Sequence, residues 1–172
     1  MAKPNDAAGP KAALWMTYRD PRDLAEFTAQ TLFAKKIACA RCHQHPYDRW
    51  TVNDNVSYAT LFAKVRISGN TIVRDPLGTI PHPETGATVP ARLLGSAQPS
   101  PSATPPQEIL AQSATGNRDL ATLIVNRTWK ELFGTGLVEP IDDIRPGNPS
   151  RFPALLTRLT DAFIENGMRI KW

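Results

Sequence analysis

The apolar positions of this chain recur mostly at helical spacing. From about Pro21 to Ala38 they return every three or four residues, which predicts an amphipathic helix behind a proline at its first turn. The segments 53–63 and 117–133 show the same period, and Gly134 is expected to end the second of them. A last helix is expected over residues 153–167.

A shorter alternating pattern surrounds Gly69-Asn70. Residues 66–68 and 71–73 are rich in β-branched side chains, and a Gly-Asn pair between them suits a two-residue hairpin turn. A further turn is expected at Pro83–Gly86. The predicted fold class is therefore mainly α with a small β-hairpin region.

The middle of the chain is rich in proline. Between Pro76 and Pro106 lie eight of the 16 prolines, together with many small polar residues. Such a composition predicts an extended linker over residues 95–114. The domain prediction is residues 1–94 as the end of one helical domain and residues 115–172 as the start of another.

Composition and charge exclude several classes of protein. The hydrophobic fraction of 41% and the charged fraction of 21% are typical of a globular chain. The net charge of +4 is small, and basic residues form no run longer than Lys35-Lys36, so nucleic acid is not an expected partner. No apolar stretch approaches the length of a membrane span, and the start Met1–Asp6 does not resemble a signal peptide.

The only two cysteines form one motif with a histidine, Cys39-Ala40-Arg41-Cys42-His43. C-x-x-C-H is the signature of covalent c-type haem attachment. Cysteines three residues apart on a helical turn lie on one side of the backbone, so both sulfurs can reach the two vinyl groups of one porphyrin. His43 would then be the proximal axial ligand of the iron.

Zinc is the main alternative cofactor for this motif. Cys39 and Cys42 would make one pair of zinc ligands, but a tetrahedral site needs a second pair. His43 and His45 follow the first pair too closely to supply it easily, and His82 is the only other histidine. A redox dithiol and simple coincidence also remain open, although the βαβ pattern of a thioredoxin-like protein is missing.

The remaining histidines are candidates for metal-ligand and neighbouring roles. His82 lies between two prolines at a predicted turn that could fold back over the motif, so it is the candidate sixth ligand, with a plain turn histidine as the alternative. His45 is too close to His43 to reach the opposite face of a porphyrin, and a supporting or structural role is expected for it.

A second polar group is expected in the C-terminal part. Asn126-Arg127 and Asp142-Asp143 flank a helix–loop junction, and we expect an Arg127–carboxylate pair that holds the loop. A catalytic acid is the less favoured interpretation of these carboxylates.

Two long motifs resemble known families. Residues 39–51 resemble the C-x-x-C-H-x-H-P-[FY]-D-x-W-T segment of the planctomycete cytochrome-associated DUF1549 proteins. Residues 125–143 look like the opening of the DUF1553 domain. In that family the two domains occur together in large exported proteins. The resemblance implies that this chain is an internal fragment of an extracytoplasmic protein, which accounts for the missing export signal.

The resulting functional hypothesis is a haem c-binding fragment that serves electron transfer or haem-dependent oxidation, with a redox protein as a possible partner. Cys39, Cys42, His43 and His82 are the expected cofactor-binding residues, and His43, His45 and His82 are the candidate metal ligands. The alternative is a non-catalytic structural or binding module in which zinc or a buried Cys/His cluster replaces haem. Catalysis itself is left undecided.

Overall fold

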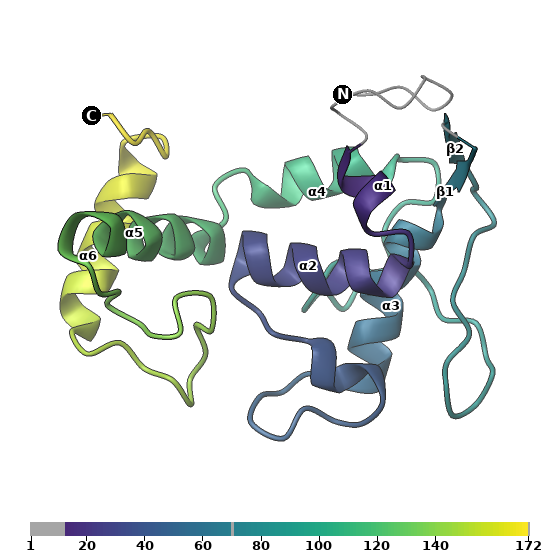
Figure 1. Cartoon of the computed structure of the whole chain (residues 1–172), viewed down its shortest axis with the longest axis horizontal. Coiled ribbons are helices and arrows are strands. Elements are labelled where there is room, and N and C mark those ends of the chain that lie inside the picture. The colour runs from purple at the N-terminus through teal and green to yellow at the C-terminus, as the bar shows by residue number, and fades with distance from the viewer. Residues whose placement is uncertain (1–12, 70, 172) are drawn as a thin grey trace. The chain divides into compact units, whose positions relative to one another are not determined.

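Most of the helical periodicity becomes helix in the folded chain (Figure 1). The computed structural model describes residues 13–69 and 71–171, so Asn70 and the start Met1–Asp6 lie outside the described residues. The elements in chain order are α1 (Ala13–Thr17), α2 (Pro21–Phe33), the 3₁₀ turn η2 (Ala38–Arg41), α3 (Val52–Ala63), β1 (Val65–Ser68), β2 (Thr71–Arg74), α4 (Pro106–Ala114), α5 (Arg118–Phe133) and α6 (Pro153–Glu165).

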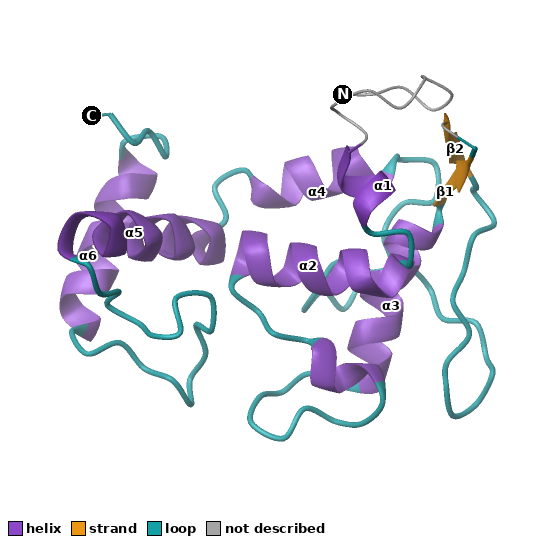
Figure 2. Ribbon diagram, viewed as in Figure 1, coloured by secondary structure: helices purple, strands orange, loops and turns teal. Residues whose placement is uncertain are grey.

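The mainly α fold class with one small hairpin is confirmed (Figure 2). Strands β1 and β2 pair antiparallel with Ser68 opposite Thr71, which leaves the predicted two-residue connection. Gly69 adopts a φ of +61°, a conformation that suits glycine because it has no Cβ. The turn at Pro83–Gly86 also forms, and the Gly86 N–H donates to the His82 carbonyl at 2.8 Å.

The first long helix ends earlier than its sequence period predicts. α2 stops at Phe33, and Ala34 takes a φ of +55° that turns the chain out of the helix. Ala34 and Ile37 are each only 1% exposed, so this exit buries two apolar side chains that a continued helix would have carried elsewhere. The cysteines therefore stand on the separate turn η2 instead of on the end of α2.

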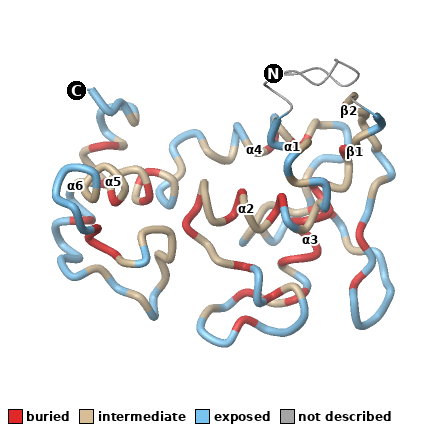
Figure 3. Tube along the Cα trace, in the orientation of Figure 1, coloured by how far each residue is buried: buried red, intermediate tan, exposed pale blue. Residues whose placement is uncertain are grey.

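Helix α3 supplies the centre of the first apolar core. Nine of its twelve residues are buried (Figure 3). Its N-cap is Thr51, ahead of the predicted positions 53 and 54, and Asp54 completes a capping box with it. At the other end, Phe62 contacts Tyr58 edge-on with ring centroids 5.3 Å apart.

The described residues pack as two units. One contains the chain up to Phe27 together with Ile37–Gln112, and the other contains Thr28–Lys36 together with the chain from Ser113 onward. Within the stretch predicted to be linker, residues 106–114 form α4, in which Pro106 and Ile109 are buried. The proline content predicted an extended conformation for this segment, whereas burial of apolar side chains stabilises a helix there.

The second unit is organised around α5 and α6. Asn117 caps α5 and Gly134 ends it with a φ of +79°, as the sequence predicts. The apolar core contains the buried residues Leu137, Val138 and Leu156 with four partly buried neighbours. Beside this core, fully buried Asn126 accepts from the Val138 N–H at 3.0 Å and donates to the carbonyls of Val138 and Ile141.

The predicted Arg127–carboxylate pair is replaced by other contacts. Arg127 donates to the Thr31 carbonyl at 3.2 Å. Asp142 pairs with Lys36 at 3.5 Å, and Asp143 pairs with Arg145 at 3.1 Å. The Asn126 amide, and not Arg127, binds the loop after α5. An amide can both donate to and accept from backbone groups, whereas an arginine side chain can only donate.

Replacing Asn126 by alanine is expected to lower the free energy of unfolding by about 3 kcal/mol, because two buried backbone groups and one partly buried group lose their partner and each buried loss costs roughly 1–3 kcal/mol. Urea unfolding followed by circular dichroism measures the change. The exposed Asn166→Ala, which removes one local bond to Ala162, is the control and is expected to cost about 0.5 kcal/mol or less. Equal losses for the two variants would contradict the assignment.

Candidate functional site

The two cysteines lie three residues apart at the 3₁₀ turn η2. Cys39 lies within η2 and Cys42 caps its C-terminus by donating its backbone N–H to the Cys39 carbonyl. A 3₁₀ helix has about three residues per turn, so side chains at i and i+3 eclipse each other. Both cysteines are free and exposed, whereas Ala40 between them is 0% exposed. The turn therefore buries its Ala40 side and presents both thiols to solvent.

Arg41 occupies a different side of the same turn. Its guanidinium lies 2.7 Å from an oxygen of Asp23, 3.4 Å from Asp20 and 3.2 Å from Glu26. We call these four residues the Arg41 network. Asp20 directly precedes α2, and the other two carboxylates lie within its first two turns. The network thus connects the turn that carries the cysteines to the N-terminal end of α2.

Part of this network is buried. Oε1 of Glu26 and Nε of Arg41 face each other as an ion pair without the alignment of a hydrogen bond, and both atoms are inaccessible to solvent. Burial raises the pKa of Glu26 above its usual value, and the Arg41 charge opposes this shift without cancelling it. For Arg41, burial acts to lower the pKa, but the Asp23 hydrogen bond and the nearby carboxylates outweigh burial, so the pKa is raised.

Asn55 adds a neutral member to the buried polar region. It is 0% exposed in the first turn of α3, and its amide donates to the Ile37 carbonyl at 3.1 Å. This bond attaches the residue just before η2 to α3. A hydrogen bond from Asn55 also acts to lower the pKa of Glu26, so α2, η2 and α3 share one polar contact region.

His43 follows the turn with an exposed side chain. Its Nδ1 lies 2.8 Å from the carbonyl oxygen of Gln44. A carbonyl oxygen can only accept a hydrogen bond, so Nδ1 must be the donor and the neutral ring keeps its lone pair on Nε2. Metal-bound histidines usually donate their second ring N–H to a carbonyl or a carboxylate in this way.

The other two histidines show the opposite arrangement. Nδ1 of His45 accepts the backbone N–H of Tyr47 at 3.1 Å, and Nδ1 of His82 accepts that of Glu84 at 3.3 Å. A backbone N–H can only donate, so the neutral rings carry their proton on Nε2. Both side chains are buried, at 9% and 7% exposed. In this conformation neither ring offers a free lone pair, and each acts as the acceptor of a tight turn.

The segment of His82 is nevertheless attached to the same end of α2 as the cysteine turn. Arg22 at the start of α2 donates to the Pro81 carbonyl at 3.3 Å, while Arg41 contacts Asp23 one residue further along. Among the described residues, no group of three or more His, Cys, Asp or Glu side chains is arranged to hold a metal ion. The predicted ligand roles of His45 and His82 therefore stay predictions.

The cations near the motif are already paired with carboxylates. Lys35 contacts Asp119 at 3.2 Å, and Lys36 contacts Asp142. The charges of Lys35, Lys36 and Arg41 are thus largely compensated by carboxylates, and they give little support to a redox dithiol.

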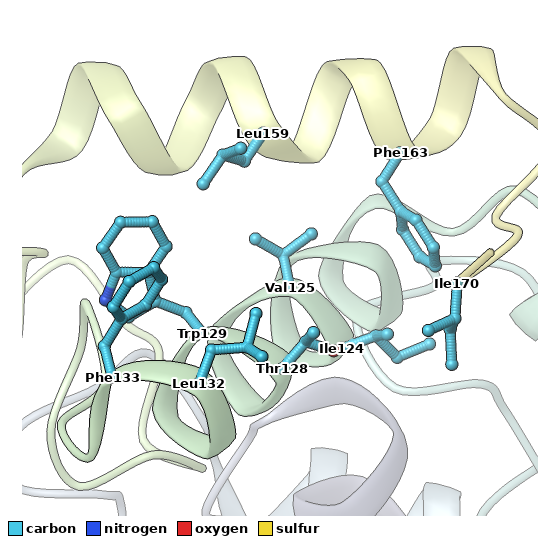
Figure 4. A pocket seen from close by; sticks show the side chains of 9 residues that line it. All are labelled: Ile124, Val125, Thr128, Trp129, Leu132, Phe133, Leu159, Phe163 and Ile170. Carbon is cyan, nitrogen blue, oxygen red and sulfur yellow. The ribbon is translucent and has the colours of Figure 1, made fainter. Parts of the chain in front are cut away.

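A separate apolar cleft lies in the second unit, between α5 and α6 (Figure 4). Its volume is about 340 Å³, and the rings of Trp129 and Phe133 pack at a tilt along one side with centroids 4.2 Å apart. Cys39, Cys42 and His43 do not line this cleft. Thr128 is the one side chain of its lining with a hydroxyl group, and no charged residue lines it, so the cleft offers little for chemistry.

Sequence reasoning identified the cysteines and His43 but missed the polar support beneath them. Two signals were available in the sequence. Asp20, Asp23 and Glu26 recur at a spacing of three, which places them near one another on a helix. Asn55 is a polar residue inside an apolar helical segment. No helix within the described residues has the length and apolar character needed to cross a membrane.

Replacing Glu26 by glutamine is expected to change how stability depends on pH. A raised carboxyl pKa in the folded state contributes stability that is fully present below the ordinary value of 4.5 and is lost as pH rises through the higher folded pKa. Glutamine cannot ionise, so the stability of Glu26→Gln relative to the unsubstituted chain should increase with pH over this window.

Urea midpoints of both chains across a pH series measure this difference. The groups that face Glu26 are Arg41, Asp23, Asp20 and the Asn55 amide. If the relative stability of the variant instead fell as pH rose, the ion pair with Arg41 would dominate over burial, and the sign assigned to the Glu26 pKa would be wrong.

Comparison with known proteins gives two family matches and no closer relative. Residues 2–67 match the model of PSCyt2, described as a protein of unknown function (DUF1549), and residues 108–172 match that of PSD1, described as a protein of unknown function (DUF1553). Neither a curated protein nor a solved structure matches the chain. The first match contains η2 and the Arg41 network, and the second contains α5 and α6. The chain therefore joins a DUF1549 (PSCyt2) segment to a DUF1553 (PSD1) segment.

Proposed function

We propose that this chain binds haem c covalently through Cys39 and Cys42, with His43 as the proximal ligand, and that it serves electron transfer or haem-dependent oxidation. One observation carries the proposal. Two exposed thiols stand one 3₁₀ turn apart, and the next residue is a histidine whose Nδ1 donates to a carbonyl. Such a histidine keeps the Nε2 lone pair that an iron atom needs.

The residues present suit the attachment chemistry. Each thiol would add across one vinyl C=C bond, forming one C–S bond and one C–H bond, so the step consumes neither an oxidant nor a reductant. The spacing of Cys39 and Cys42 by three residues at a 3₁₀ turn favours both sulfurs on one side of the turn, as bonds to a single porphyrin require. When bound, haem supplies a one-electron iron couple whose potential depends on the axial ligands and on the surroundings.

The hydrogen bonds of the three histidines differ, and this difference supports His43 as the proximal ligand. His43 is exposed and its hydrogen bond leaves Nε2 free to bind a metal, whereas His45 and His82 use Nδ1 as acceptors within turns. His82 remains the proposed sixth ligand only if its turn opens and its proton moves from Nε2 to Nδ1. An iron with an open sixth position would favour catalysis over simple electron transfer.

The proposal extends to location and partner. Thioether attachment of haem to C-x-x-C-H takes place outside the cytoplasm, so we propose an extracytoplasmic location for the intact protein. A one-electron centre needs a donor or an acceptor, and a second redox protein is the proposed partner. Zinc held by the two cysteines, in a structural or binding module, is the alternative that the experiment below must distinguish.

Covalent haem is expected on the chain after export in a host with active c-type maturation. A pyridine haemochrome spectrum that persists after acid–acetone extraction measures thioether attachment. Cys39→Ala and Cys42→Ala should each shift the spectrum and lower the haem yield, and the double variant should carry no covalent haem. A folded, colourless product with stoichiometric zinc would establish the alternative and contradict the haem proposal.

Three matched histidine substitutions test the ligand assignment. Asparagine can accept a backbone N–H two residues ahead, so His45→Asn and His82→Asn should preserve their turns and leave the haem spectrum unchanged. His43→Asn should lose the proximal ligand and change the spectrum strongly. A spectral change in His82→Asn comparable to that in His43→Asn would instead identify His82 as an iron ligand.

A further inference from the structure

We infer that Arg41 is the positioning residue of the attachment site, holding the cysteine turn against α2 so that both thiols face one ligand before it arrives. The inference rests on the proposed function, because it assigns Arg41 a part in haem attachment. It concerns a residue that the C-x-x-C-H pattern leaves unspecified.

Arg41 is the one long polar side chain in η2. The turn reads Ala38-Cys39-Ala40-Arg41, and the three preceding side chains are short. Its backbone bonds are local: the Ala40 N–H donates to Ile37, and the Cys42 N–H donates to Cys39. Only Arg41 has a side chain within the turn that can bond to a separate helix.

The partners of Arg41 all belong to one end of α2. The shortest contact, 2.7 Å, is a hydrogen bond to Asp23, and Asp20 and Glu26 lie within 3.4 Å of the guanidinium. Isolated surface ion pairs contribute little, but a network of several charges is more effective, above all where one member is buried. The Glu26 side chain is 19% exposed and its Oε1 is inaccessible to solvent, so one member of the network is partly buried.

Arginine suits this position better than lysine would. A guanidinium is planar and presents five N–H donors, so one side chain can contact carboxylates on different sides. Here Nη2 contacts both aspartates while Nε faces Glu26. A lysine ammonium is a single compact charge that could satisfy one or two of these carboxylates but not the whole set.

The consequence for the cysteines follows from the geometry of short 3₁₀ turns. Such turns have poor hydrogen-bond geometry and seldom persist beyond three or four residues without outside support. With Arg41 in place, Cys39 and Cys42 stay eclipsed on the solvent side of the turn. Without it, the two thiols must be ordered at the moment of binding, which weakens any ligand that needs both.

A ligand that bridges two thiols tests this directly and without haem. Phenylarsine oxide forms two As–S bonds to a pair of neighbouring thiols and releases one water molecule. Its affinity would be measured on the full chain, reduced and free of haem. Arg41→Ala should bind the arsenical about tenfold more weakly than the unsubstituted chain, and Arg41→Lys should give an intermediate value.

Two controls separate positioning from general stability. Arg118→Ala removes another arginine–aspartate pair, to Asp161 at 2.6 Å, and should leave the affinity unchanged. The unsubstituted chain in concentrated urea gives the affinity of an unpositioned pair of thiols. Asp23→Asn should weaken binding as well, and combining it with Arg41→Ala should add little, because the two substitutions remove one shared contact.

The outcomes distinguish this inference from the proposed function. Equal arsenical affinities for Arg41→Ala and the unsubstituted chain, with both folded by circular dichroism, would overturn the role of Arg41 even if the exported chain carries haem. A tenfold loss in Arg41→Ala together with an exported chain that carries no haem would support positioning of the two thiols and reject the haem proposal.

Discussion

The contact between Arg41 and the carboxylates at the start of α2 is the interaction on which the geometry of the candidate site depends. It joins the turn η2 to the N-terminal end of α2, although the chain leaves α2 at its C-terminal end before it reaches the turn. The pairing places the partly buried Glu26 carboxylate opposite a guanidinium that two aspartates also contact. Burial raises the pKa of Glu26 while the Arg41 charge acts to lower it, so desolvation offsets part of what this ion pair contributes.

The early end of α2 is what makes that contact possible. If the helix had continued to Ala38, both cysteines would lie beyond its C-terminal end. Asp20 would then lie at the opposite end of the helix. Ala34 instead adopts a positive φ, and the following residues return to bury Ile37. The energetic cost of a left-handed alanine is about 1–2 kcal/mol, which the burial of one isoleucine side chain can offset.

In each unit a buried asparagine on a helix forms hydrogen bonds to the backbone of an irregular segment. Asn55 binds the Ile37 carbonyl ahead of the cysteine turn, and Asn126 binds both Val138 and Ile141 in the loop after α5. Each lies on a helix that also buries apolar residues. An amide can satisfy the backbone of an irregular segment inside a core, where an unpaired carbonyl or N–H would be costly. The two loops therefore keep a defined path without regular secondary structure.

Much of the secondary structure could be predicted from local sequence, because its causes are local. The cap Asn117, the stop Gly134, the hairpin around Gly69 and the helix beginning at Pro153 all act within a few residues of themselves. The motif of Cys39, Cys42 and His43 is equally local, and the sequence alone identified it. Which families the chain resembles was also contained in these contiguous residues.

Tertiary structure decided what depends on residues distant in sequence. The end of α2 at Phe33 follows from burial of Ile37, and the partner of Arg41 depends on which helix face the turn meets. The proton positions on His43 and His82 follow from neighbouring carbonyl and N–H groups whose location only the folded loops define. Helical period and motif spacing describe the chain along its length, whereas burial and pairing of polar groups depend on the three-dimensional path.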